Sequence, residues 1–482
     1  MTKTYLKYRS RVIITSGFIV FFWVGLSVRL FQIQIVDGEE LRLKGQSQSM
    51  VQKPLKAVRG NIYDRENVAF TRNIIHYSFG VHPSQIENKD EFAEWISDAT
   101  GEDKSKYLKK LNSSRSFEYL ERNLQRKHCE KLLVNKPNGL IVERDSRRYY
   151  PHGSLAAQAI GFVDLDDKGI AGIEQKYNSY LTGAPGWVVR QMSGRGNTRY
   201  KTNLPQKPPV DGASIQLTID LEYQAILQEE LAMQVEKTSA SSAMGLILNP
   251  QTGDILAMAT VPDFDPNYPG RGEIGWQRNK VITDQFEPGS TFKIVPITGA
   301  VDQNTVSLWQ EFNCENGSYT FAGQTIKDWD DFGLLTVPQI MENSSNVGVI
   351  KIAETLGRNN LYRYSRNLGF GMATNISLAG EHPGTLRQVT EWSHISLAQI
   401  SLGHEVGVTT LQLGMAYAAI ANGGFLMKPR LIKQIISSSG KTVYAEQPEV
   451  IRKVASKNVM DIMTDMLCRV VDTGTGTKAA IN

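Results

Sequence analysis

The chain has 482 residues, of which 41% are hydrophobic and 21% charged, and its formal net charge is +4. This length predicts two or three folded units, and the ordinary composition predicts globular domains. The small net charge argues against nucleic-acid binding, which requires a concentrated basic surface.

The N-terminus predicts a membrane anchor. Basic residues at positions 3, 7, 9 and 11 precede a stretch without charge from Val12 to Val28, and apolar residues continue to Ile35. We therefore predict one transmembrane helix over residues 12–35 and a cytoplasmic tail of residues 1–11, because basic flanks stay inside. This places the rest of the chain outside the plasma membrane. A cleavable signal peptide is the alternative, but no A-x-A site follows.

Residues 36–215 are predicted to mix helices and strands. Apolar and polar side chains alternate over residues 75–81, which is typical of a strand, and residues 91–111 have a charged helical pattern. Two segments, 59–65 and 148–174, combine arginine, glycine and acidic residues, and by themselves they indicate turns and ion pairs.

The pattern changes near residue 216. Asp220 can cap an amphipathic helix that runs from Leu221 to Val235. Apolar runs separated by turn residues predict two hairpins, the first of them in a buried sheet. The runs are residues 244–249 with 254–261, and 431–436 with 442–445.

The segment from Phe286 to Lys293 predicts a turn that leads into a helix, with Pro288 near the first turn. Ser290 and Lys293 would share a face of this helix, where the lysine amine can take the serine proton. Burial and the positive end of the helix disfavour the charged lysine, and the same helix end would stabilise an oxyanion. Pro296 is unusual inside a helix and is expected to kink it.

Neither polar motif is specific alone. S-x-x-K recurs at Ser438 to Lys441 inside a predicted turn, and the alternative at Ser290 is a helix start with a solvated lysine. A second polar cluster, Glu342 to Asn346, has the form of a helix junction, where serine can act as a cap. S-x-N recurs at residues 365–367 and 456–458. The order and surroundings of the motifs must therefore decide.

The cysteines and histidines are scattered. Cys129, Cys314 and Cys468 fit neither a C-x-x-C metal pattern nor a disulfide framework. The segment His404 to Val408 lacks the second histidine of H-E-x-x-H, so we predict no catalytic metal. A P-loop is excluded as well, because Ile435 stands where its first glycine is required.

Ser290-x-x-Lys293 followed by Ser344-x-Asn346 resembles the first two motifs of the penicillin-binding protein and serine β-lactamase superfamily. The settings of these motifs, residues 278–293 and 344–348, resemble the family as well. Other stretches extend the similarity across nearly the whole chain. Segments 59–65 and 148–174 resemble the pedestal of class B penicillin-binding proteins, and residues 249–267, 327–329 and 409–424 resemble their transpeptidase domain.

The resemblance implies an α+β fold, with a transpeptidase domain of antiparallel sheet and helices at residues 216–482. An elongated pedestal or dimerisation-type domain at residues 36–215 and one transmembrane helix would precede it. No stretch before residue 215 resembles the glycosyltransferase domain of class A enzymes. The short tail, the single anchor and residues 403–409 are closer to division-type than to elongation-type members.

The third family motif is missing. Neither K-T-G nor K-S-G occurs, and residues 473–482 resemble the stretch just before that motif. We therefore expect a chain truncated before the strand that binds the substrate carboxylate and completes the oxyanion hole. A natural variant without the third motif is the alternative.

The resemblance implies a penicillin-sensitive peptidoglycan D,D-transpeptidase of septal wall synthesis. Ser290 would form the acyl-enzyme with a stem peptide and Lys293 would be its base. Ser344 would relay a proton toward the leaving amine, and Asn346 would orient Lys293 or the substrate amide. No metal or organic cofactor is implied. The implied partners are stem peptides, β-lactams, a SEDS-family glycan polymerase, other division proteins and the membrane, and they include no nucleic acid.

Two rival functions stay open. A D,D-carboxypeptidase or β-lactamase would use water in place of the acceptor amine, and the anchor and pedestal argue against it. A non-catalytic scaffold would position a membrane glycan polymerase, and the missing third motif keeps this possibility open.

Overall fold

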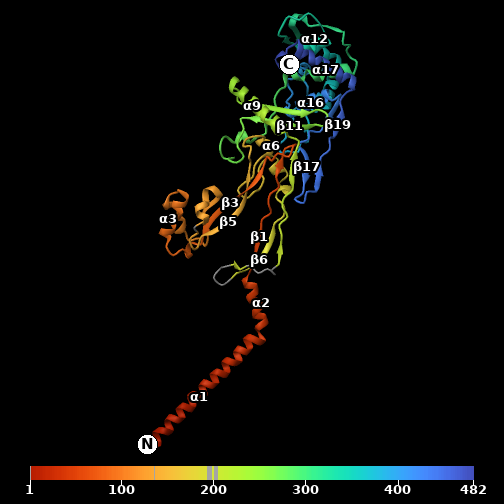
Figure 1. Cartoon of the computed structure of the whole chain (residues 1–482). Coiled ribbons are helices and arrows are strands. Elements are labelled where there is room, and N and C mark those ends of the chain that lie inside the picture. The colour runs from red at the N-terminus through yellow and green to blue at the C-terminus, as the bar shows by residue number, and fades with distance from the viewer. Residues whose placement is uncertain (1, 135, 193–197, 200–204, 482) are drawn as a thin grey trace. The chain divides into compact units, whose positions relative to one another are not determined.

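The computed structural model describes residues 2–134, 136–192, 198–199 and 205–481 (Figure 1). The chain forms two compact units: Met1–Ala57 with Ala184–Val210, and Val58–Gly183 with Asp211–Asn482. Some positions of the expected tail, pedestal and transpeptidase ranges lie outside the described residues. They are residues 1, 135, 193–197, 200–204 and 482.

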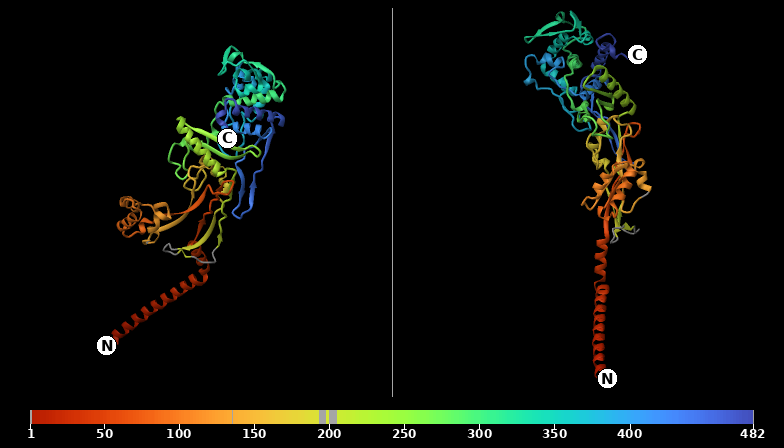
Figure 2. Two further views of the ribbon diagram at one scale, coloured as in Figure 1. Left: turned by 45° about the horizontal axis from the view of Figure 1, so that its top comes forward. Right: turned by 90° about the vertical axis from the view of Figure 1, so that its left-hand side faces the viewer.

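The first unit contains the predicted anchor helix and a small sheet. Helix α1 (Thr2–Phe31) is long and uninterrupted (Figure 2), and a π-helical turn (Gln32–Val36) continues it to α2 (Gly38–Ser49). Within Arg11–Val36 an 18-residue window has a mean hydropathy of 1.9, and this is the single helix within the described chain that is long and apolar enough to cross a membrane. The described side chains of this span are exposed, which fits lipid contact. This helix therefore fits a single-pass membrane anchor.

A four-stranded antiparallel sheet completes this unit. Its central strand, β6 (Gly186–Met192), pairs with β1 (Met50–Leu55) along one edge. Strands β7 (Thr198–Arg199) and β8 (Gln206–Lys207) also pair with β6.

The second unit includes a lobe with a core of its own. Strand β3 (Arg72–Val81) lies between β4 (Glu118–Gln125) and β5 (Ile141–Tyr149), which confirms the strand predicted at residues 75–81. The helical stretch predicted at residues 91–111 forms two helices, because Gly101 ends the first in the left-handed region (φ 77°). The helices of the lobe are α3 (Lys89–Thr100), α4 (Lys104–Leu111) and α5 (Arg126–Val134).

The larger core of this unit joins residues far apart in the chain. One cluster of buried apolar side chains reaches from Ile62 to Met466. A mixed sheet in the order β18-β17-β9-β2 joins the same regions, because β9 (Ser214–Leu217) runs parallel to β2 (Ile62–Tyr63) and antiparallel to β17 (Ile432–Ile436). Strand β18 (Thr442–Ala445) forms the predicted hairpin with β17.

The predicted first hairpin and the helix before it are both present. The hairpin of β10 (Ala243–Asn249) and β11 (Asp254–Val261) is confirmed, although β10 is only half-buried and pairs with β11 alone among the described strands. Helix α9 (Leu221–Thr238) is capped by Asp220 as predicted. As an amphipathic helix would, it turns one side inward, and this side carries the half-buried Leu227 and Leu231. Its two fully buried residues are polar, however: Gln224 and Gln228 bond to the backbone of Met258 and Ala156.

The remaining elements surround this core. The short helices before β9 are α6 (Ala157–Ile160), α7 (Gly172–Lys176) and α8 (Asn178–Leu181). The later helices are α10 (Lys280–Thr283), α11 (Ile294–Asp302), α12 (Val337–Glu342), α13 (Asn346–Leu356), α14 (Arg358–Asn367), α15 (Ser396–Ser401), α16 (Thr410–Ala421) and α17 (Lys457–Asp472). The antiparallel pairs are β12 (Glu311–Asn313) with β15 (Leu334–Thr336), β13 (Ser318–Phe321) with β14 (Gln324–Lys327), and β16 (Phe425–Met427) with β19 (Val450–Lys453).

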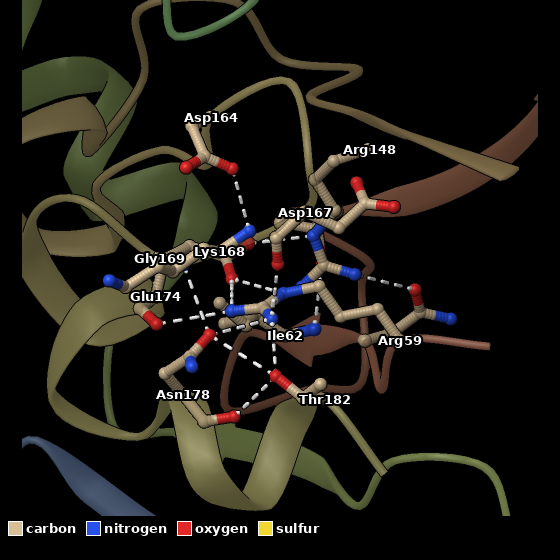
Figure 3. A network of polar contacts seen from close by, with 12 residues as sticks. Arg59, Ile62, Arg148, Asp164, Asp167, Lys168, Gly169, Glu174, Asn178 and Thr182 are labelled. Atoms are coloured by element: carbon tan, nitrogen blue, oxygen red, sulfur yellow. Dashed lines mark hydrogen bonds and ion pairs between the residues drawn. The ribbon is translucent and has the colours of Figure 1, made fainter. Parts of the chain in front are cut away.

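A buried ion-pair network confirms the contacts predicted for segments 59–65 and 148–174 (Figure 3). Glu174 is fully buried, and its two carboxylate oxygens bind Arg59 Nε at 2.8 Å and Arg148 Nε at 2.6 Å. Arg59 also donates to Asn178 Oδ1 at 2.9 Å and Thr182 Oγ1 at 3.0 Å. Because the two arginines and their acceptors come from three separate segments, these bonds link residues 59, 148 and 174–182 to one another.

Candidate active site

Ser290 and Lys293 lie on a 3₁₀ helix, Gly289–Lys293, and the α-helix α11 begins only at Ile294. Residues three apart eclipse on a 3₁₀ helix, so both side chains leave from one face. Ser290 is exposed, whereas the Lys293 side chain is buried, with 1% of its surface exposed. Pro296 lies in the first turn of α11 and not in a helix interior, and since backbone N–H groups there have no partner within the helix, the proline removes no helical hydrogen bond.

The turn under Ser290 is held by a neighbouring loop and by α16. Gly289 donates its N–H to Gly403 O at 3.2 Å, and Tyr417 donates its hydroxyl to Thr291 O at 3.0 Å. Gly403 has φ +81°, and a Cβ there would stand 2.1 Å from Gly289 O, so the close approach requires glycine. These contacts fix the backbone that carries the serine.

The Lys293 amine faces three neutral oxygens. Its Nζ donates to Ser344 O at 2.6 Å, Ser344 Oγ at 3.0 Å and Asn346 Oδ1 at 2.8 Å. Burial lowers the pKa of Lys293 to about 8, and the nearby carboxylate of Asp328 opposes this effect. A neutral amine, which can accept a proton, is therefore populated near that pH.

The helix junction predicted at residues 342–346 is confirmed. Helix α12 ends at Glu342 and α13 begins at Asn346, with Ser345 as its N-cap accepting from Gly348 N at 2.9 Å. Ser344 lies in the left-handed region, with φ 54°, a conformation that is uncommon for a residue with a side chain. In this conformation both of its oxygens face the Lys293 amine.

The structure thus brings three of the four predicted residues into direct contact. No hydrogen bond within the described chain joins Lys293 to Ser290, although both leave one face of the same turn. Catalytic hydrogen bonds often form only once substrate is bound, so the spacing is compatible with the predicted pair.

Sequence motifs missed the part played by residues 327–329. Lys327 O accepts from Asn346 Nδ2 at 2.9 Å, and Trp329 Nε1 donates to Asn343 O at 2.7 Å. The Asp328 carboxylate accepts from the start of α13. No local pattern signals this role, because the partners lie 14 to 19 positions away in the chain.

Two family profiles match the chain. Residues 243–482 match the family described as the penicillin binding protein transpeptidase domain, and residues 54–217 match the penicillin-binding protein dimerisation domain. The first match contains the Ser290 and Ser344 motifs, and the second contains the Glu174 network.

Curated relatives are similar over most of the chain. The probable peptidoglycan D,D-transpeptidase PenA of Neisseria meningitidis serogroup A is 30% identical over 95% of this chain and 78% of its own length. Stage V sporulation protein D of Bacillus subtilis is 29% identical over 98% of this chain and 74% of its own length. For the peptidoglycan D,D-transpeptidase FtsI of Buchnera aphidicola the identity is 30%, over 88% of this chain and 75% of that protein.

Solved structures share the fold. A peptidoglycan synthetase from Bifidobacterium adolescentis superposes with a TM-score of 0.69 at 25% identity, covering 88% of this chain and 82% of that one. Penicillin binding protein 3 from Mycobacterium tuberculosis, complexed with aztreonam, gives 0.67 at 25% identity, covering 89% and 80%. These matches confirm the α+β fold implied by the motifs.

Proposed function

Because the chain belongs to the class B penicillin-binding proteins, we propose that it is a peptidoglycan D,D-transpeptidase that acts in septal wall synthesis through an acyl-enzyme on Ser290. The observation that carries the assignment of residues is the buried Lys293 amine, which contacts Ser344 and Asn346 and shares a turn with Ser290. Relatives named as peptidoglycan D,D-transpeptidases support the reaction class.

These contacts support the following first half-reaction. Neutral Lys293 takes the hydroxyl proton as Ser290 Oγ attacks the carbonyl between two D-alanines of a stem peptide. As the C–N bond breaks, Ser344 Oγ, 3.0 Å from Lys293 Nζ, passes a proton to the leaving amine. Terminal D-alanine departs and the ester on Ser290 remains.

The second half-reaction reverses these proton transfers. An amine from a neighbouring stem peptide attacks the ester, its proton passes to the Lys293 amine, and Ser290 Oγ leaves with a proton returned by that lysine. Asn346 holds the lysine through Oδ1, at 2.8 Å, so that the same base serves both steps. β-Lactams would acylate Ser290 as substrate mimics, and a solved relative complexed with aztreonam supports this expectation.

The proposal extends to location and partners. Residues 1–11 would lie in the cytoplasm, 12–35 would cross the plasma membrane once, and the pedestal (36–215) and transpeptidase domain (216–482) would lie outside. The apolar helix over Arg11–Val36 supports the anchor. A SEDS-family glycan polymerase and other division proteins are the proposed partners.

A labelled penicillin tests the acyl-enzyme. We expect the full chain in detergent to form a covalent adduct that mass spectrometry assigns to Ser290 and that Ser290→Ala abolishes. Ser438→Ala is the matched control, because this serine belongs to the second S-x-x-K and lies in the turn between β17 and β18. A folded wild-type chain without adduct would favour the scaffold.

A donor pentapeptide offered together with an acceptor amine tests the transfer step. The expected product is the cross-linked peptide. Hydrolysed donor alone would instead identify a carboxypeptidase.

A further inference from the structure

The Asp328 carboxylate binds three consecutive residues at the start of α13. Oδ2 accepts from Ser345 Oγ at 2.7 Å, and Oδ1 accepts from Val347 N at 3.2 Å and from Asn346 N. The first backbone N–H groups of a helix have no partner within it, and a carboxylate there also meets the positive end of the helix dipole. Asp328 therefore caps α13 from a separate segment.

This cap lies between the two residues that contact Lys293. Ser345 is fully buried and follows Ser344, whose left-handed conformation turns its oxygens toward the amine. Asn346 follows Ser345, and its own backbone N–H is bound by Asp328. Fixing Ser345 and the Asn346 backbone thus fixes both partners of the lysine.

The two neighbours of Asp328 in the chain also hold the residues around Ser344. Lys327 O accepts from Asn346 Nδ2 at 2.9 Å, which leaves Oδ1 of the same amide to face Lys293 at 2.8 Å. An amide turned by 180° would present its N–H₂ group to the lysine and lose both contacts. Trp329 holds the residue before Ser344 through its bond to Asn343 O.

Asp328 also acts on Lys293 through its charge. Its attraction raises the pKa of Lys293, against the stronger lowering by burial. Its oxygens are already bound to α13, so the carboxylate does not form a direct ion pair with the amine. Lys293 is therefore left with neutral hydrogen-bond partners and can lose its proton.

We propose that Asp328 is a positioning residue of this site, whose carboxylate fixes the start of α13 so that Ser344 and Asn346 hold the Lys293 amine toward Ser290. The effect of Asp328 on catalysis rests on the proposed transpeptidase function. Its effect on the position and pKa of the Lys293 amine is independent of that function.

Three variants of the full chain test the proposal. Asp328→Asn removes the charge but keeps an oxygen that can accept from Asn346 and Val347. Asp328→Ala removes the charge and every hydrogen bond of the carboxylate. Asp331→Ala is the matched control, because Asp331 is an exposed acidic residue of the same loop.

Two readouts need no turnover. The first is the titration of the Lys293 amine by NMR with lysine labelled at Cε and Nζ, the signal being assigned by its loss in Lys293→Arg. The second is hydrogen exchange of the Asn346 and Val347 amides. We expect both Asp328 variants to titrate Lys293 at lower pH than wild type, and Asp328→Ala to speed exchange as well. Penicillin acylation by Asp328→Ala should slow about 10- to 100-fold, as misplaced catalytic groups do.

The proposal is wrong if the Asp328 variants match Asp331→Ala in titration and exchange. Faster exchange with an unmoved titration would also overturn it, because Asp328 would then serve folding alone. If wild type forms no penicillin adduct, the proposed function fails, while titration and exchange still decide the role of Asp328.

Discussion

Two clusters of the second unit bury cationic side chains but give them different hydrogen-bond acceptors. Arg59 and Arg148 share the carboxylate of Glu174, with donor–acceptor distances of 2.6 to 2.8 Å. Lys293 is equally buried but donates to neutral oxygens of Ser344 and Asn346. The first cluster keeps its charges and joins chain segments, and the second lets its cation become neutral.

The contrast follows from the side chains and their partners. A buried charge is tolerated when an opposite charge and further hydrogen bonds surround it, and arginine does not deprotonate in proteins. Lysine does, once burial without a direct carboxylate partner destabilises its ammonium form. Burial alone therefore does not distinguish a structural ion pair from a buried base. The charge of the nearest hydrogen-bond acceptor distinguishes them.

The largest effect is expected from Lys293→Met. Penicillin acylation should fall about 10²- to 10⁴-fold, because the proton acceptor is lost. The free energy of unfolding should stay level or rise, since a poorly compensated buried amine is replaced by an apolar chain of similar length. Stopped-flow acylation and urea unfolding of the same sample measure both. Retained acylation would exclude Lys293 as the base.

Glu174→Ala should act on stability. It leaves Arg59 and Arg148 buried without their carboxylate, and breaking a buried ion pair in this way destabilises by about 3–5 kcal/mol. Urea unfolding of the second unit is the measurement, and Glu174→Gln, which keeps the shape, separates charge from packing. An unchanged unfolding midpoint in both variants would show that the Glu174 network does not stabilise the fold.

The pH profile sharpens the difference between the clusters. Lys293 accepts a proton only when neutral, so acylation should fall about tenfold for each pH unit below its pKa of about 8 and level off above it. The destabilisation caused by Glu174→Gln should change little between pH 7 and 9, since arginine keeps its charge there. An acylation rate that is flat between pH 6 and 9 would contradict a lysine base.

The smallest effect is expected at an exposed pair. Lys457 Nζ lies 2.7 Å from Asp461 Oδ2, one turn apart on α17, and both side chains are largely exposed. Solvent and salt screen such pairs, so Asp461→Ala should change the unfolding free energy by about 0.5 kcal/mol or less. A change as large as that of Glu174→Ala would mean that burial does not set the strength of ion pairs in this protein.

Local features were predicted well from the sequence, because each depends on a few neighbouring residues. Asp220 caps α9, the turn at residues 250–253 closes a hairpin, and the Ser345 junction starts α13. Features that depend on the surroundings of an element were not predicted. The two fully buried residues of α9 are glutamines that bond to distant backbone, and a 3₁₀ turn precedes α11, so that Pro296 lies in the first turn of this helix.

The sequence by itself determined the residue types of the site, their order and the turns that carry them. It also predicted a membrane anchor, because a long uncharged apolar stretch near the N-terminus is typical of a membrane span. Only the tertiary structure decided that the Lys293 amine is buried, which oxygens it meets and that Asp328 holds them. The reason is physical: desolvation and the field of a carboxylate depend on atoms brought together from distant parts of the chain, whereas caps and turns depend on neighbours in sequence.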